Sequence, residues 1–135
     1  MILLSLLAVG SITTEFELLD RAIATCSRTV VSPAFAADPA RRSVVMTETV
    51  REQEAIVSER IDIAVRRRAL RETRPAGIKV GDNEQVLNMA ALALEDRQRA
   101  LNDRRMLETM RTEAMDVKRR YYLAHCAKGT NDAQD

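Results

Sequence analysis

The chain has 135 residues, of which 46% are hydrophobic, and this is the composition of a protein that folds. It contains only four glycines and three prolines, too few for the turns of a many-stranded β fold. Twenty-one basic and 20 acidic residues give a net charge of +1, which disfavours a wholly basic nucleic-acid-binding protein. We therefore expect an all-α protein whose core is aliphatic, because aromatic residues make up only 3% of the chain.

The first 37 residues have two interpretations. The apolar run from Ile2 to Val9 is too short to span a bilayer, and it resembles the hydrophobic part of a secretory signal. Ala34-Phe35-Ala36 resembles the cleavage site of an exported bacterial protein. In the other interpretation, this apolar segment stays on the chain and is followed by a short helix. The sequence leaves a cytoplasmic and a periplasmic location open, and we expect no membrane-spanning segment.

A short helix is predicted to begin at Thr14 and to end near Arg28. Thr14-Glu15-Phe16-Glu17 has the form of a capping box, with acidic residues in the first turn. Residues 29–37 are predicted to form a connector, because Pro33 biases the residue before it toward extended geometry. Apolar residues at helical spacing predict one shared face on this helix, made of Phe16, Leu19, Ile23 and Cys26.

The chain has two cysteines, Cys26 and Cys126, and a single histidine, His125. No metal-ligand spacing is present, so we expect no metal and no other cofactor. Neighbouring side chains on a helix diverge by about 100°, which disfavours His125 and Cys126 as a catalytic base and nucleophile. A disulfide would require an oxidising compartment, and the sequence leaves open whether the cysteines pair.

Two long helices are predicted, over residues 39–73 and 82–127. Asp38-Pro39 is a strong helix start, and Pro75-Ala76-Gly77 ends the first helix. The second begins at Asp82 and is followed by Gly129, a typical C-terminal stop. A connection of about eight residues forces antiparallel pairing, so residues 38–128 form a coiled-coil-like hairpin domain in a protein of two to four helices. Residues 129–135 are expected to be a disordered tail.

Both long helices carry apolar residues at helical spacing. A hairpin of two helices exposes half of each apolar stripe. We therefore expect a second copy of the chain or a helical protein partner to cover the exposed part. The residues expected at this interface are Val50, Val57, Ile61, Leu107, Met110 and Val117.

Arginines are concentrated before the predicted turn. Four of them lie at spacings of 7, 4 and 3 and share one helix face; this arginine stripe consists of Arg60, Arg67, Arg71 and Arg74. Such a stripe can bind an anion or an acidic partner. It can equally pair with acidic residues of the second long helix, such as Glu84, Glu95 and Asp96. Nucleic acid is disfavoured, since the chain has no recognition motif and no aromatic residue near the stripe.

One family resemblance covers residues 55–126. Glu59-Arg60 is followed by a second cation eleven residues later, Arg71, and this spacing resembles the first helix of the all-helical chorismate mutases of the exported type. Further partial similarities are Ile78, Asp82, Glu84, Val86-Leu87 and the segment from Tyr121 to Ala124.

The resemblance implies a helical isomerase in which Arg60 and Arg71 grip the two carboxylates of a dianionic metabolite. Catalysis would then be electrostatic and would need no nucleophile. The chain differs from the family pattern where a second-helix arginine is usual, because Asp82 or Asn83 occupies that position. Lys118 or Arg120 occupies the position of the family's last-helix glutamine or glutamate.

The sequence thus favours a non-enzymatic helical interaction or scaffold protein whose arginine stripe steers the orientation of a partner. The alternative is a mutase-like enzyme, or an inactive homologue of one, that binds a dianionic metabolite through Arg60 and Arg71.

Overall fold

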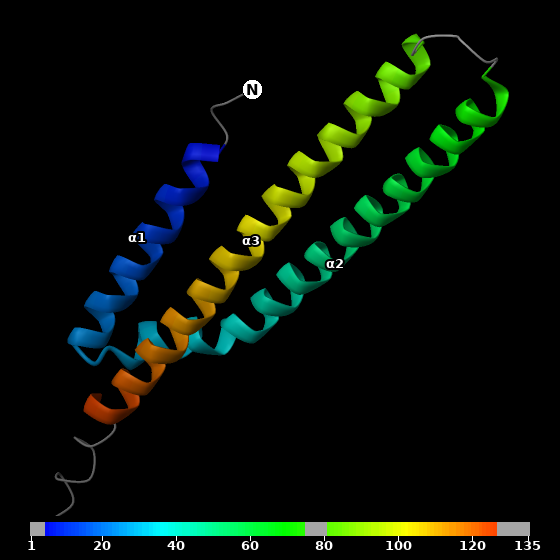
Figure 1. Cartoon of the computed structure of the whole chain (residues 1–135). Helices are drawn as coiled ribbons and strands as arrows, with labels where there is room; N and C mark the ends of the chain where they lie inside the picture. The colour runs from blue at the N-terminus through cyan, green and yellow to red at the C-terminus, as the bar shows by residue number, and fades with distance from the viewer. Residues whose placement is uncertain (1–4, 75–80, 127–135) are drawn as a thin grey trace, which may run out of the picture. The chain divides into compact units, whose positions relative to one another are not determined.

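Three helices make up the described part of the chain in this computed structural model, which describes residues 5–74 and 81–126. They are α1 (Ser5–Ala24), α2 (Arg28–Thr73) and α3 (Asp82–Cys126), and no strand occurs within these ranges (Figure 1). The predicted all-α fold is confirmed. Within the same ranges, no helix is long and apolar enough to cross a membrane. The predicted turn at Pro75-Ala76-Gly77 and the predicted tail lie outside the described residues.

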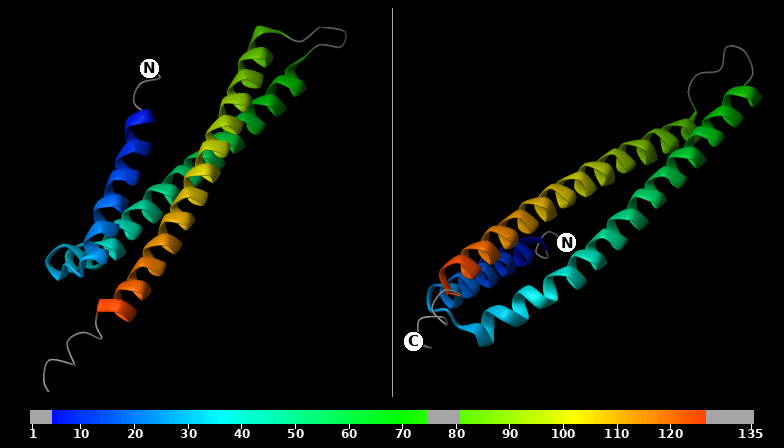
Figure 2. Two further views of the ribbon diagram at one scale, coloured as in Figure 1. Left: turned by 90° about the vertical axis from the view of Figure 1, so that its left-hand side faces the viewer. Right: turned by 90° about the horizontal axis from the view of Figure 1, so that it is seen from below.

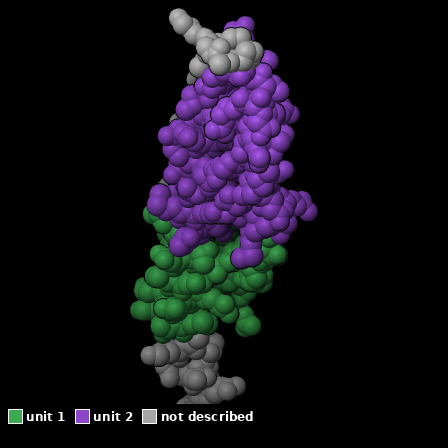
Figure 3. All heavy atoms as spheres, turned by 45° about the vertical axis from the view of Figure 1, so that its right-hand side comes forward, with its two compact units in different colours: residues 1–43, 110–135 green, residues 44–109 purple. Residues whose placement is uncertain are grey.

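The chain divides into two compact units (Figure 3). Unit 1 consists of Met1–Ser43 and Met110–Asp135, and unit 2 consists of Val44–Thr109. In unit 2, α2 and α3 run in opposite directions (Figure 2), which confirms the predicted hairpin. Contacts between the two helices define the register: as the residue number increases along α2, the residue number of the contact partner on α3 decreases. The contacts are Glu48 with Arg104, Glu52 with Arg97, Arg67 with Asn88, and Arg74 with Glu84.

α2 begins at Arg28 rather than at residue 39, so the predicted connector over residues 29–37 is wrong. Val31 is fully buried, and Ala34 and Phe35 pack against the same core. Their spacing of three and four residues places them on one helix face. The free energy gained by burying this face outweighs the cost of the backbone hydrogen bond that a proline inside the helix removes.

Asp38, predicted to cap the start of a helix, lies inside α2 and is only 6% exposed. Its carboxylate pairs with Arg41, at 3.2 Å from Nη2, and with Arg42. Arg42 also donates from Nη2 to Oδ1 of Asp116 on α3, at 3.0 Å. This hydrogen bond is the main cause of the raised pKa of Arg42, and desolvation opposes it. A buried carboxylate is tolerated in the helix because two guanidinium groups compensate its charge.

The core of unit 1 joins all three helices. The short helix predicted from Thr14 to near Arg28 is wrong in both bounds, because α1 begins at Ser5 and ends at Ala24, and Cys26 lies beyond it. Its predicted apolar face is confirmed at Leu19 and Ile23, which are buried; Phe16 packs at the edge of the core. Each such aliphatic side chain contributes about 1.5–3 kcal/mol when it is fully buried. The buried residues of this core are Leu19, Ala22, Ile23, Val31 and Met115. All except Met115 precede Ala34-Phe35-Ala36, so this core requires the segment that a cleavage there would remove.

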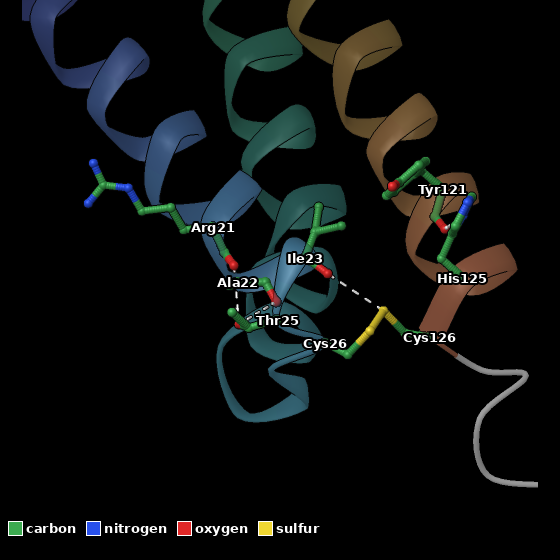
Figure 4. The surroundings of a disulfide bond; sticks show 8 residues. All are labelled: Arg21, Ala22, Ile23, Thr25, Cys26, Tyr121, His125 and Cys126. Atoms are coloured by element: carbon green, nitrogen blue, oxygen red, sulfur yellow. Dashed lines mark hydrogen bonds between the residues drawn. A yellow bond between two sulfur atoms is a disulfide. The ribbon is translucent and has the colours of Figure 1, made fainter.

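Cys26 and Cys126 form a disulfide with Cα atoms 5.5 Å apart (Figure 4). Cys26, two residues after the end of α1, adopts a left-handed backbone conformation with φ of 52°. Two backbone hydrogen bonds surround it: Ser27 N–H donates to Ala22 O at 2.8 Å, and Cys26 N–H donates to Ile23 O at 3.0 Å. These are the bonds of a Schellman motif, in which glycine is the usual left-handed residue. The disulfide thus joins the corner after α1 to the last residue of α3.

The core of unit 2 is a line of aliphatic residues between α2 and α3. On α3, three leucines repeat every seven residues, and on α2 two isoleucines lie seven residues apart. This spacing keeps one face of each helix toward the other. The buried residues are Ile56, Ile63, Leu87, Leu94 and Leu101.

Candidate protein-interaction surface

One side of the α2–α3 pair in unit 2 is held by ion pairs. Arg97 on α3 donates to Glu52 at 2.9 and 3.2 Å and to Glu59 at 2.7 Å. Arg104 pairs with Glu48 on the same side. The hydrogen bonds from Arg97 lower the pKa of the Glu52 carboxyl below its ordinary value of 4.5, although desolvation opposes this effect. The two glutamates in turn raise the pKa of Arg97. We call this surface the ion-pair side.

On the opposite side of the pair, the acceptors of the interhelical hydrogen bonds are neutral side-chain amides. Gln53 and Gln98 exchange two amide hydrogen bonds, at 3.1 and 3.2 Å. Arg67 donates from Nη2 to Oδ1 of Asn88 at 2.9 Å. Amide groups satisfy each other's donors and acceptors but do not neutralise a guanidinium charge. We call this surface the amide side.

A cleft of about 360 Å³ lies on the amide side. Two arginines of α2 line it, Arg60 and Arg67, and α3 contributes one acid, Glu95. Arg60 makes no ion pair with any described residue. The cleft therefore carries more positive than negative charge. Its apolar lining consists of Ile63, Ala64, Ala91 and Leu94.

An apolar stripe on α2 lies next to this cleft. It consists of Val50, Val57 and Ile61, which are 48%, 43% and 60% exposed, and we call it the α2 stripe. Ala64 lines the cleft and lies three residues after Ile61, so the two neighbour each other on the helix surface. The core residues of α2 lie about 120° around the helix from this stripe, as the spacing of 100° per residue requires. The predicted interface residues of α2 thus share one exposed face.

The predicted interface residues of α3 are also exposed, but on other surfaces. Leu107 lies one helical turn after Arg104, which pairs with Glu48, so Leu107 belongs to the ion-pair side of unit 2. Met110 and Val117 belong to unit 1. The structure therefore groups Val50, Val57 and Ile61 on α2 and does not bring Leu107 to them.

The four residues of the arginine stripe make three different kinds of contact. Arg60 and Arg67 line the cleft. Arg74 pairs with Glu84 across the two helices, as the pairing alternative predicted, whereas Arg71 donates to the backbone carbonyl of Arg67 at 3.4 Å. Of the other two acids named in that alternative, Asp96 pairs with Arg99 on its own helix and Glu95 lines the cleft.

The only histidine and the cysteine beside it do not form a catalytic pair. Cys126 is in the disulfide, and the His125 ring stacks on Tyr121 with centroids 4.0 Å apart (Figure 4). His125 Nδ1 also lies 3.0 Å from the Tyr121 carbonyl oxygen. Among the described residues, no group of three or more His, Cys, Asp or Glu side chains is arranged to hold a metal ion.

Sequence reasoning missed two features of this region. It did not find that Ile56 and Ile63, rather than the α2 stripe, face α3. It also did not find the ion pairs of Arg97, although the seven-residue spacing of Glu52 and Glu59 is a signal that they share one face.

Comparison with known proteins gives no match: no family model, no curated protein and no solved structure is similar to this chain.

Proposed function

We propose that the protein is a non-catalytic helical interaction module that binds a helix on the α2 stripe. The observation that carries this proposal is the exposure of Val50, Val57 and Ile61 on a helix whose core-facing residues lie elsewhere. The stripe is therefore not needed to hold α2 against α3, and it leaves aliphatic surface available for association.

The energetics favour a helical partner. Full burial of a valine or isoleucine contributes about 1.5–3 kcal/mol, so covering the remaining exposed part of three such residues is a substantial driving force. Their spacing of seven and four residues matches the repeat with which two helices pack side by side. The partner is either another protein or a second copy of this chain.

The test uses a designed helical peptide of about three heptads, with leucine at the core positions and glutamine beside them. We expect saturable binding in fluorescence anisotropy, and we expect Val57→Asp to weaken it by about 10-fold, because a charge would enter the apolar contact. Met89→Asp is the control, since it changes an exposed apolar residue of α3 outside the stripe.

Self-association is measured in parallel by sedimentation velocity on the protein alone. Association that Val57→Asp abolishes and Met89→Asp preserves supports the second-copy form of the proposal. The proposal is wrong if the wild-type protein neither binds the peptide nor associates with itself at high concentration.

A second candidate function is the binding of a dianionic metabolite, as in the chorismate mutases that the sequence resembles. The observation that favours it is the cleft with Arg60 and Arg67, although Arg71 does not line that cleft. Consumption of chorismate by the purified protein, abolished by Arg60→Ala with helical content unchanged, would support this function. The absence of turnover at millimolar substrate would exclude the enzyme.

A further inference from the structure

From the charges beside the α2 stripe we infer the chemistry of the partner: an acidic amphipathic helix that places one carboxylate in the cleft between Arg60 and Arg67. This inference rests on the proposed function and adds the partner's charge and the residues that recognise it. The chemical basis is the guanidinium group, which donates parallel hydrogen bonds to a carboxylate.

The two arginines and the stripe alternate along the same helix. Arg60 follows Val57 by three residues, and Arg67 follows Arg60 by seven. A separation of seven residues corresponds to about 10.5 Å along a helix, which is the repeat of the residues that flank the core of a paired helix. A docked helix can therefore place an acidic residue opposite each arginine while its apolar residues cover the stripe.

Arg60 and Arg67 differ in their charge compensation from Arg66 and Arg68, whereas Arg71, which lies outside the cleft, donates only to a backbone carbonyl. Arg66 pairs with Asp62 at 3.0 Å, and Arg68 pairs with Glu72 at 2.8 Å. Arg67, in contrast, donates its side-chain hydrogen bond to the neutral amide of Asn88, and Arg60 has no ion-pair partner among the described residues. The cleft thus keeps positive charge that the fold does not use.

Two other occupants, a second copy of the chain and a small anion, would match fewer features of this surface. A twofold contact between two copies centred on the cleft would place Arg60 and Arg67 opposite themselves, because the same patch is used on both subunits. A small free anion would compensate the arginines but would leave Val50, Val57 and Ile61 exposed. An acidic amphipathic helix both covers the stripe and compensates the cleft.

The experiment compares three versions of the designed peptide, in which the positions beside the leucine core are all glutamine, all glutamate or all lysine. We expect the glutamate peptide to bind at least about 10-fold more tightly than the lysine peptide at low salt. This preference should shrink as the ionic strength rises, because the rim of the contact is open to solvent.

The double variant Arg60→Gln with Arg67→Gln should remove the preference for the glutamate peptide and retain binding of the glutamine peptide. Arg51→Gln with Arg68→Gln is the matched control: it removes the same charge from exposed positions of α2 outside the cleft and should keep the preference. Circular dichroism verifies that both variants are folded.

The outcomes separate this inference from the proposed function. Equal binding of the glutamate and lysine peptides, with glutamine-peptide binding intact, overturns the acidic partner and leaves the interaction module standing. Binding of none of the peptides, together with self-association through the stripe, replaces the acidic helix by a second copy. Arg60-dependent binding of malate at micromolar concentration, with neither peptide binding nor self-association, makes the cleft a small-anion site and overturns both.

Discussion

The two units of the molecule are stabilised in different ways. Unit 1 attaches α1 to the ends of the long helices by a disulfide and by charged residues around an aromatic ring. Arg111, whose side chain is only 9% exposed, donates to both carboxylate oxygens of Glu15 and lies 5.2 Å from the centroid of the Phe16 ring. Lys118 lies at the same distance from this ring and pairs with Asp20.

Unit 2 has no covalent link between its described residues other than the backbone. It relies on one line of aliphatic residues and on ion pairs that lie mainly on one side. Two helices cannot enclose their own apolar surface, so unit 2 exposes the α2 stripe, whereas a third helix contributes to the core of unit 1. The comparison teaches that a third helix and a binding partner are alternative ways to cover the apolar surface that two paired helices leave exposed.

The largest expected effect comes from removing the disulfide that distinguishes unit 1. Replacing both cysteines, by Cys26→Ser with Cys126→Ser, should lower the free energy of unfolding by about 4 kcal/mol, because a long loop is no longer closed in the unfolded chain. Hydrogen exchange should then accelerate in α1 and in the last turns of α3, while the middle of unit 2 keeps its protection.

A reducing agent should have the same effect on the wild-type protein and none on the double serine variant. Equal acceleration of exchange in both units would show that the comparison between them is wrong and that they unfold together.

The next largest effect concerns the aliphatic core of unit 2. Leu94→Ala should lower the free energy of unfolding by about 3 kcal/mol in urea denaturation, because it leaves a cavity between α2 and α3. Leu92→Ala, two residues away on the exposed face, should cost less than about 0.5 kcal/mol. A comparable loss for the two variants would mean that the face of α3 assigned to the core is incorrect.

The smallest effect is the pH dependence of the ion-pair side. The pKa of Glu52 is lower in the folded protein than its ordinary value of 4.5, so the unfolded chain binds more protons in this range. Its contribution to stability is therefore present above about pH 4.5 and is lost as the pH falls through the folded pKa. Urea midpoints measured across this range should fall less steeply for Glu52→Gln than for the wild type.

The fold could be predicted from the sequence where one pattern dominated. The seven-residue repeat of Leu87, Leu94 and Leu101 is regular over the first half of α3, and the bounds of that helix agree with the prediction to within one residue. On α2, the core line runs through Thr49, Ile56 and Ile63, and a threonine weakens its apolar signal. The α2 stripe is a second apolar line on the same helix, and only contact with α3 identifies which of the two forms the core.

Other features depended on tertiary structure that local rules do not include. Pro33 and Pro39 favour a break by their local chemistry, but packing of Val31 and compensation of Asp38 by arginines keep α2 continuous. The positions of Arg60 and Arg67 on one helix face were predictable, whereas the cleft they line requires Glu95 and Ala91 from the facing helix. The sequence shows which residues share a helix face, and the pairing of helices determines what that face meets.

The disulfide also has a mechanical consequence. Cys26 and Cys126 are separated by 100 positions, and the bond between them closes that part of the chain into a covalent ring that contains all of unit 2. A pulling force applied between α1 and the residues after Cys126 passes through the sulfur atoms instead of through the hairpin. Unit 2 then bears no load, and roughly 340 Å of extended chain stays stored until the bond is reduced.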